Sequence, residues 1–317
     1  MSIFDELIFK KQTINMKSTP QSEPILIEES QVKPSNKSRL FPTFIDLVVI
    51  FAAFIAAQIA SVLVVKKTLP LIISSSAAGF VDSLTILLAQ VIAMSLTIAF
   101  IAFLRSSRSA KPSPMRFSLR GFDPTILLAG VLMLLSMGVV LEPLLSLLPA
   151  PPAISQRGWP MLVAIVLAAP FFEEIICRGL IYESMRAKWG VVVAWLGSSL
   201  FFALMHLDAA MVINAFFMGL ILCYIYIRTR SLIAPMILHA INNGLAFLLI
   251  LLGLGGDDGN VMLSDLIASQ RAYWIIYIVA VLILIVAVLL CVGQFKAIIA
   301  ASTTQDREAE GGENKSA

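Results

Sequence analysis

The sequence predicts an all-α fold, a polytopic transmembrane helix bundle of about eight membrane helices. Hydrophobic residues make up 59% of the 317 residues and charged residues only 14%, and the mean hydropathy is +0.91. This balance is far from that of a soluble domain. Apolar runs long enough to cross the ~30 Å hydrocarbon core of a bilayer recur along most of the chain.

The apolar runs give the order of the predicted helices. They cover residues 44–65, 84–104, 125–148, 160–186, 190–207, 209–228, 232–253 and 272–294. The run 190–207 is the shortest, and its Gly197, Ser198 and Ser199 suit close packing of helices in a membrane. Pro170 and Pro235 permit kinks in their helices.

The same runs divide the chain into regions. Residues 1–40 are polar, proline-containing and without a sustained hydrophobic period, which predicts a disordered cytoplasmic tail. Residues 41–150 then form three accessory helices, and residues 160–253 form a core of the fourth to seventh helices. A last helix at 272–294 and a polar C-terminal tail at 295–317 complete the prediction.

The positions of Lys and Arg predict the topology. With the N-terminus inside, the cytoplasmic segments hold 18 of these residues and the outer loops hold 4. Because cytoplasmic loops collect Lys and Arg, we expect a multi-pass protein of the cell's inner (plasma) membrane with both termini in the cytoplasm. The net charge of +3 is too small to indicate nucleic acid as a partner.

Cysteine usage excludes one class of site. Cys177, Cys223 and Cys291 are odd in number and lie in separate apolar runs. We therefore expect neither a disulfide framework nor a cysteine-based metal site.

Three charged side chains interrupt the fourth apolar run, in the sequence Phe-Phe-Glu-Glu-Ile-Ile-Cys-Arg at 171–178. Each costs about 2.5–3.5 kcal/mol at the centre of a membrane helix. Glu174 and Arg178 are four residues apart, so they share a helix face and can pair. Glu173 points about 100° away from Glu174 and is free to meet another helix. Alternatively, the three residues form a buried polar cluster that only fixes helix packing.

The two histidines of the chain also fall inside apolar runs. His206 closes the sequence Phe-Ala-Leu-Met-His, and His239 opens the sequence His-Ala-Ile-Asn-Asn, which ends at Asn243 on the same helix face. A single histidine on an apolar helix is more often a hydrogen-bonded core residue than a catalyst. Here both histidines of the chain lie in apolar runs, as does the Glu-Glu pair at 173–174, and this combination favours a shared intramembrane site.

At these residues the chain resembles the CPBP family of intramembrane proteases. This family includes the type II CAAX prenyl proteases and the bacteriocin-processing or immunity proteins formerly called Abi. The three family motifs appear here as Glu-Glu-x-x-x-Arg at 173–178, Phe-x-x-x-His at 202–206 and His-x-x-x-Asn at 239–243. The resemblance covers roughly residues 160–250.

The resemblance implies an enzyme that cleaves a peptide bond inside the membrane. Glu173 and His206 would activate a water molecule, and His239 and Asn243 would donate hydrogen bonds to the developing oxyanion. A carboxylate in a low-dielectric site is a stronger base, and oriented donors act most strongly where water is scarce. Glu174 and Arg178 would be catalytic-site residues that support Glu173.

A second chemistry uses the same residues. Glu173, His206 and His239 make a His₂Glu set of the kind that binds catalytic zinc, as in a metalloendopeptidase. The chain lacks a His-Glu-x-x-His motif, and Asn243 is more useful as an oxyanion donor than as a zinc ligand. The sequence therefore names no certain cofactor, with zinc as the alternative.

The expected partners are the lipid bilayer and a membrane-associated peptide or protein substrate, lipidated and CAAX-like in the best-known relatives. The competing function is a non-proteolytic membrane protein of the same fold, active in bacteriocin immunity, binding or transport. A transporter more often shows an inverted repeat with broken helices in both halves. Here the intramembrane polar motifs lie only in the second half.

The charge asymmetry makes a prediction about topology. A reporter that is active only outside the cytoplasm should stay dark when it is fused after Arg120 and should be active when it is fused near Asp258. The opposite pattern would contradict the eight-helix arrangement.

Overall fold

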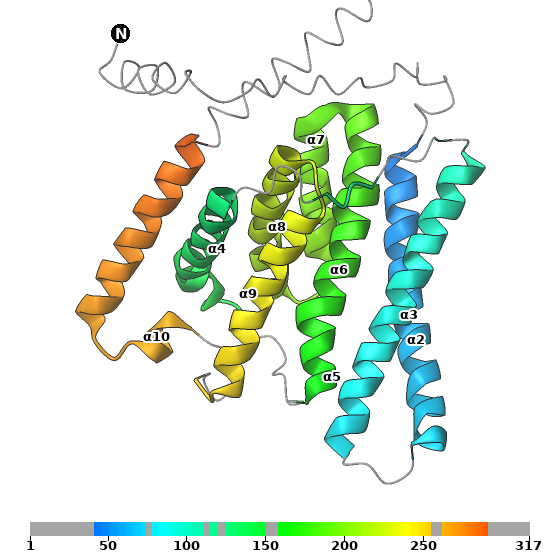
Figure 1. Cartoon of the computed structure of the whole chain (residues 1–317), viewed down its shortest axis with the longest axis horizontal. Helices are drawn as coiled ribbons and strands as arrows, with labels where there is room; N and C mark the ends of the chain where they lie inside the picture. The colour runs from blue at the N-terminus through cyan, green and yellow to red at the C-terminus, as the bar shows by residue number, and fades with distance from the viewer. Residues whose placement is uncertain are drawn as a thin grey trace, which may run out of the picture. The chain divides into compact units, whose positions relative to one another are not determined.

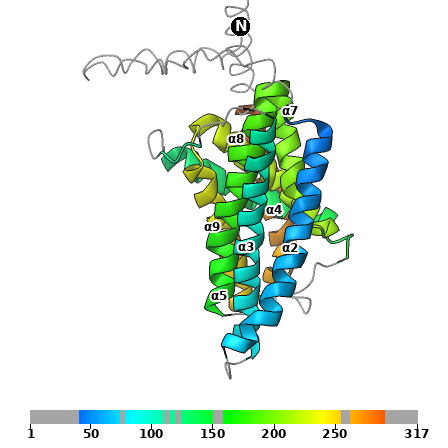
Figure 2. The same cartoon turned by 90° about the vertical axis from the view of Figure 1, so that its right-hand side faces the viewer.

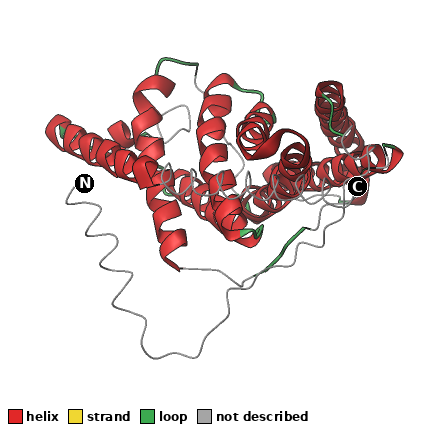
Figure 3. Cartoon of the chain, turned by 90° about the horizontal axis from the view of Figure 1, so that it is seen from above, coloured by secondary structure: helices red, strands yellow, loops and turns green. Residues whose placement is uncertain are grey.

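The structure is a computed structural model that describes residues 41–73, 78–108, 110, 115–118, 124–149, 158–254 and 262–290. These residues form helices and loops without a strand (Figure 3). The elements are α2 (Phe44–Ile72), α3 (Ala78–Ser107), α4 (Pro124–Leu145), α5 (Trp159–Leu162), η2 (Val163–Ala168), α6 (Ala169–Glu174), η3 (Ile175–Tyr182), α7 (Glu183–Leu204), α8 (Ala209–Thr229), α9 (Ile233–Leu251), α10 (Leu263–Leu266) and a last helix, Gln270–Leu290. The tails expected at 1–40 and 295–317 lie outside the described residues.

Seven helices in the described part of the chain are long and apolar enough to cross a membrane. One of them, Trp159–Leu204, has 46 residues and would be about 69 Å long if it were straight, more than twice the thickness of the hydrocarbon core. It is not straight, because Gly190 has φ 79° and ψ 175°. The chain reverses there, and Figure 1 shows the two arms of α7 joined by an arch.

The two arms pack against each other. A Cβ atom placed on Gly197 would collide with Cε of Met185, from the other side of the reversal. The 46-residue helix thus supplies two crossings, which confirms the predicted polytopic bundle of about eight membrane helices. The reversal lies where the sequence separates the apolar runs 160–186 and 190–207.

The first two helices are longer than the sequence predicts. The run 44–65 was expected to end before Lys66 and Lys67, but α2 continues through both lysines to Ile72. A helix can project beyond the hydrocarbon core, and lysine stems can lie along it while their ammonium groups reach water. In Figures 1 and 2, α2 and α3 run side by side.

The centre of the bundle is formed by the helices that carry the motifs. The most apolar stretch is 56% buried in Trp159–Leu204 and 61% buried in Ala209–Thr229. In the last helix only 6% of this stretch is buried. The main hydrophobic core accordingly contains residues of η3, α7, α8 and α9, including Ile176, Phe202, Leu222 and Leu238. The charged residues of the fourth apolar run therefore lie inside the protein rather than against lipid.

Gly190 provides a test of this arrangement. Its combination of φ and ψ is essentially restricted to glycine, so we expect Gly190→Ala to lower the free energy of unfolding by about 1–3 kcal/mol. Gly138→Ala, in the interior of α4 where an added Cβ would meet no atom within 4 Å, should be neutral or stabilising by up to about 1 kcal/mol. Denaturant titrations in detergent measure both. Equal effects would contradict a reversal at Gly190.

Candidate active site

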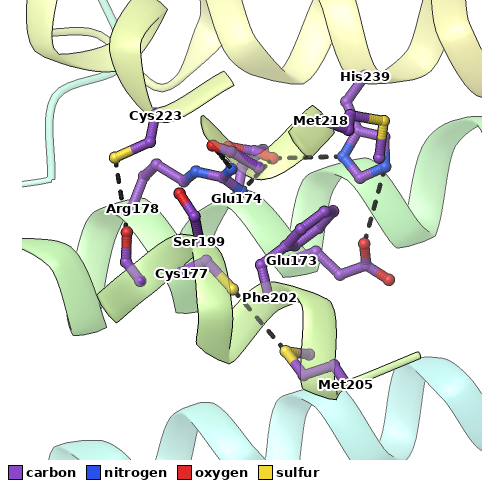
Figure 4. A network of polar contacts seen from close by, with 12 residues as sticks. Glu173, Glu174, Cys177, Arg178, Ser199, Phe202, Met205, Met218, Cys223 and His239 are labelled. Atoms are coloured by element: carbon purple, nitrogen blue, oxygen red, sulfur yellow. Dashed lines mark hydrogen bonds and ion pairs between the residues drawn. The ribbon is translucent and has the colours of Figure 1, made fainter. Parts of the chain in front are cut away.

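Glu173 and Glu174 end α6 and stand between two π-helical segments, η2 before them and η3 after them. Such wide turns occur frequently at functional sites. Glu174 and Arg178 are both fully buried, and Arg178 Nη1 donates to Glu174 Oε1 at 2.8 Å (Figure 4). The pairing expected from their four-residue spacing is therefore present.

Arg178 also joins η3 to α7 and α8. Its Nη2 donates to the carbonyl oxygen of Gly219 at 2.9 Å, and its guanidinium carbon lies 4.8 Å from the centre of the Phe202 ring, within the range of a cation–π contact. Gly219 permits the close approach of α8, since a Cβ there would lie 3.2 Å from Cα of Ser199. One guanidinium thus fixes three helical segments around the carboxylates.

His239 reaches both carboxylates from α9. Its Nδ1 lies 3.3 Å from Glu174 Oε1, and its Nε2 lies 3.8 Å from Glu173 Oε2 (Figure 4). We assign the proton to Nδ1, because an ionised carboxylate only accepts hydrogen bonds. Glu174 then orients the imidazole, and Nε2 is left facing Glu173.

The cluster has a simple charge balance. Two carboxylates and one guanidinium leave a net charge of −1, and an uncompensated charge inside a membrane protein is costly. One further proton on Glu173 or His239 makes the cluster neutral. The Oε2 of Glu173 is buried without a hydrogen-bond partner among the described residues.

The structure does not join the other two predicted residues to Glu173. His206 is half-buried, and its Nδ1 lies 3.0 Å from the carbonyl oxygen of Phe202. Asn243 Nδ2 donates to the carbonyl oxygen of Ile165 at 3.1 Å. Arg178, Glu174, His239 and Glu173 form a continuous chain of contacts, whereas His206 and Asn243 bond to backbone carbonyls.

Phe202 is a site residue that lies in the Phe-x-x-x-His motif but for which the sequence predicted no role. Its ring meets the imidazole of His206 at a centroid distance of 5.0 Å and that of His239 at 5.5 Å, both edge to face, and it also lies under Arg178. Phe202 is thus a spacer between the two histidines. Its place four residues before His206 was visible in the sequence, but a phenylalanine on an apolar helix carries no signal of this role.

The positions of the acidic and histidine side chains test the alternative of a zinc site. Among the residues that the structure describes, no three His, Cys, Asp or Glu side chains are grouped so that they could hold a metal ion. Glu173, His206 and His239 are therefore not brought together as ligands. The physical reason is that Phe202 packs against both imidazoles and Glu174 engages His239 at Nδ1.

The fold and this cluster define a multi-pass membrane protein with a charged site inside its helix bundle, and comparisons with known proteins identify the family it resembles. The pattern of the family described as type II CAAX prenyl endopeptidase Rce1-like matches residues 155–245. This segment contains all three motifs, and the resemblance to the CPBP proteases is confirmed there.

A curated protein of Bacillus subtilis (strain 168), named "Putative membrane peptidase YdiL", is 29% identical to this chain over 83 residues. The match covers 26% of this chain and 34% of that protein, so it spans about a third of the relative's length. No solved structure matches the chain significantly.

The buried ion pair makes a prediction about stability. Arg178→Ala leaves Glu174 buried without its cation and should lower the free energy of unfolding by about 3–5 kcal/mol. Arg178→Lys should restore only part of this loss, because a single ammonium lacks the fork that reaches both Glu174 and Gly219. Unfolding in detergent measures both changes.

Arg108→Ala is the control. Arg108 pairs with Asp46 at 3.0 Å, but its side chain is 45% exposed. The buried Asp46 keeps hydrogen bonds from the amide and hydroxyl of Thr43, so the loss of Arg108 should cost less than about 1 kcal/mol. If Arg178→Ala unfolded like the parent and lost only turnover, Arg178 would have a direct catalytic role instead of a supporting one.

Proposed function

We propose that the protein is a CAAX-type intramembrane endopeptidase that hydrolyses a peptide bond of a membrane-associated substrate. The observation that carries this proposal is the pair formed by Glu173 and His239. A buried carboxylate oxygen without a hydrogen-bond partner faces an oriented imidazole nitrogen at 3.8 Å. At such a separation a small polar molecule can bridge the two groups. The match to the CAAX endopeptidase pattern over residues 155–245 supports the proposal.

In the proposed reaction, Glu173 is the general base. With His239 carrying the further proton that balances the cluster, Glu173 is ionised and takes a proton from the attacking water as the water oxygen bonds to the peptide carbonyl carbon. The carbon–nitrogen bond then breaks, and the proton held by Glu173 passes to the leaving amide nitrogen. The products are a carboxylic acid and an amine, and Glu173 returns to its ionised form.

His239 and Asn243 stabilise the oxyanion in this proposal. When protonated on both nitrogens, His239 donates from Nδ1 to Glu174 and from Nε2 to the oxyanion. Asn243 lies one helical turn further along α9, and one of its two amide hydrogens is engaged by Ile165, which leaves a second hydrogen as a donor. Donors fixed before the reaction act strongly in a site from which water is excluded.

His206 completes the water site in this proposal. Its Nδ1 hydrogen is committed to the carbonyl oxygen of Phe202, so Nε2 is left as a hydrogen-bond acceptor for the attacking water. No step is assigned to a metal ion, because the candidate ligands are not grouped around a common point. A metal analysis of the purified protein tests this assignment directly.

Glu173→Gln is the decisive variant. Glutamine keeps the shape of the side chain but cannot accept the proton, so cleavage of prenylated and unprenylated peptides in proteoliposomes should be lost while peptide binding remains. Glu142→Gln is the matched control, since Glu142 is also buried but caps the backbone amides of Leu263 and Ser264. It should retain turnover. Full cleavage in Glu173→Gln would contradict the role of Glu173 as general base, and full biological function of a variant that does not cleave would leave only a binding or immunity function.

A further inference from the structure

The backbone of η2 leaves one carbonyl group without its helical partner. The amide of Ala169 donates five residues back, to the carbonyl oxygen of Ala164. In the same pattern the carbonyl oxygen of Ile165 would accept from residue 170, but that residue is Pro170, which has no N–H. Inside a membrane protein such a free carbonyl must find a partner elsewhere.

Asn243 is that partner. Its Nδ2 donates to the carbonyl oxygen of Ile165 at 3.1 Å, across the contact between α9 and η2. The next residue, Gly244, lies beside Val166 of η2, at a distance where an added Cβ would make an ordinary van der Waals contact, 3.5 Å from Cγ1 of Val166. Asn243 is therefore tied to the neighbouring helical segment through a carbonyl that has no donor from residue 170, because that residue is a proline.

We propose that Pro170 is a positioning residue for the catalytic site. By withholding an N–H, it makes the Ile165 carbonyl the acceptor that fixes the amide of Asn243. The same bond sets the position of α9 against α6, and hence that of His239 against Glu173, which follows Pro170 by three residues. This inference rests on the proposed function, in which Asn243 and His239 stabilise the oxyanion.

A double-mutant cycle on thermal stability tests the bond itself. In the parent, Asn243→Leu removes the donor while nearly keeping the volume, and the buried carbonyl left behind should lower the unfolding midpoint by roughly 2–4 °C. Pro170→Ala supplies an N–H for the Ile165 carbonyl. In that background Asn243→Leu should lower the midpoint much less, because the two changes are coupled.

Turnover tests the positioning role. Pro170→Ala should lower kcat at least tenfold with KM nearly unchanged, and Asn243→Leu should lower kcat by about 100- to 1,000-fold, as the loss of one oxyanion donor does elsewhere. The double variant should be no slower than Asn243→Leu alone. Pro143→Ala, at the proline inside α4, should retain the parental kcat.

The outcomes separate the two proposals. Additive effects on the midpoint, or a parental kcat in Pro170→Ala, would overturn the role of Pro170. Coupled midpoints together with parental turnover in Asn243→Leu would confirm the bond but contradict the proposed oxyanion function, and the positioning role would fail with it. If Pro170→Ala does not fold, a midpoint of Asn243→Leu equal to that of the parent still overturns the inference.

Discussion

The ion pair between Arg178 and Glu174 is the interaction on which the rest of the structure depends. Both side chains are fully buried, so neither charge is tolerable without the other. The pair then determines its neighbours. Arg178 holds the Gly219 carbonyl of α8 and the Phe202 ring of α7, and Glu174 orients His239 of α9. A charge pair formed by one turn of one helix thus places three other segments around Glu173.

Much of the fold could be predicted from the sequence, because it depends on residues that are close together along the chain. Apolar length determines which runs cross a membrane, and four-residue spacing determines that Glu174 and Arg178 pair. Two features escaped this reasoning. The lysines at 66 and 67 do not end α2, because long side chains can leave the hydrocarbon core while the helix continues. The π-helical segments have no periodic signature of their own, since they depend on how Pro170 and the neighbouring helices share backbone hydrogen bonds.

The candidate site was less predictable, because it depends on distances between helices. Both histidines had the same sequence signal, yet only His239 contacts the two carboxylates, whereas His206 bonds within its own helix. Asn243 was expected to donate a hydrogen bond to the oxyanion, and the structure shows a bond from it to the Ile165 carbonyl that the sequence did not predict. The close approach at Gly219 and the spacer role of Phe202 arise from packing between helices. The spacing of apolar residues along the sequence does not predict such packing.

The central claim is that Glu174, fixed by Arg178, holds the proton of His239 on Nδ1 and turns Nε2 toward Glu173. Nitrogen NMR of protein labelled at histidine tests it most directly, because the chain has only two histidines and a His206→Gln variant assigns the signals. The account predicts a protonated, hydrogen-bonded Nδ1 in His239 that loses this bond in Glu174→Leu, which has no acceptor oxygen. A His239 with an unprotonated Nδ1, unchanged in that variant, would contradict it.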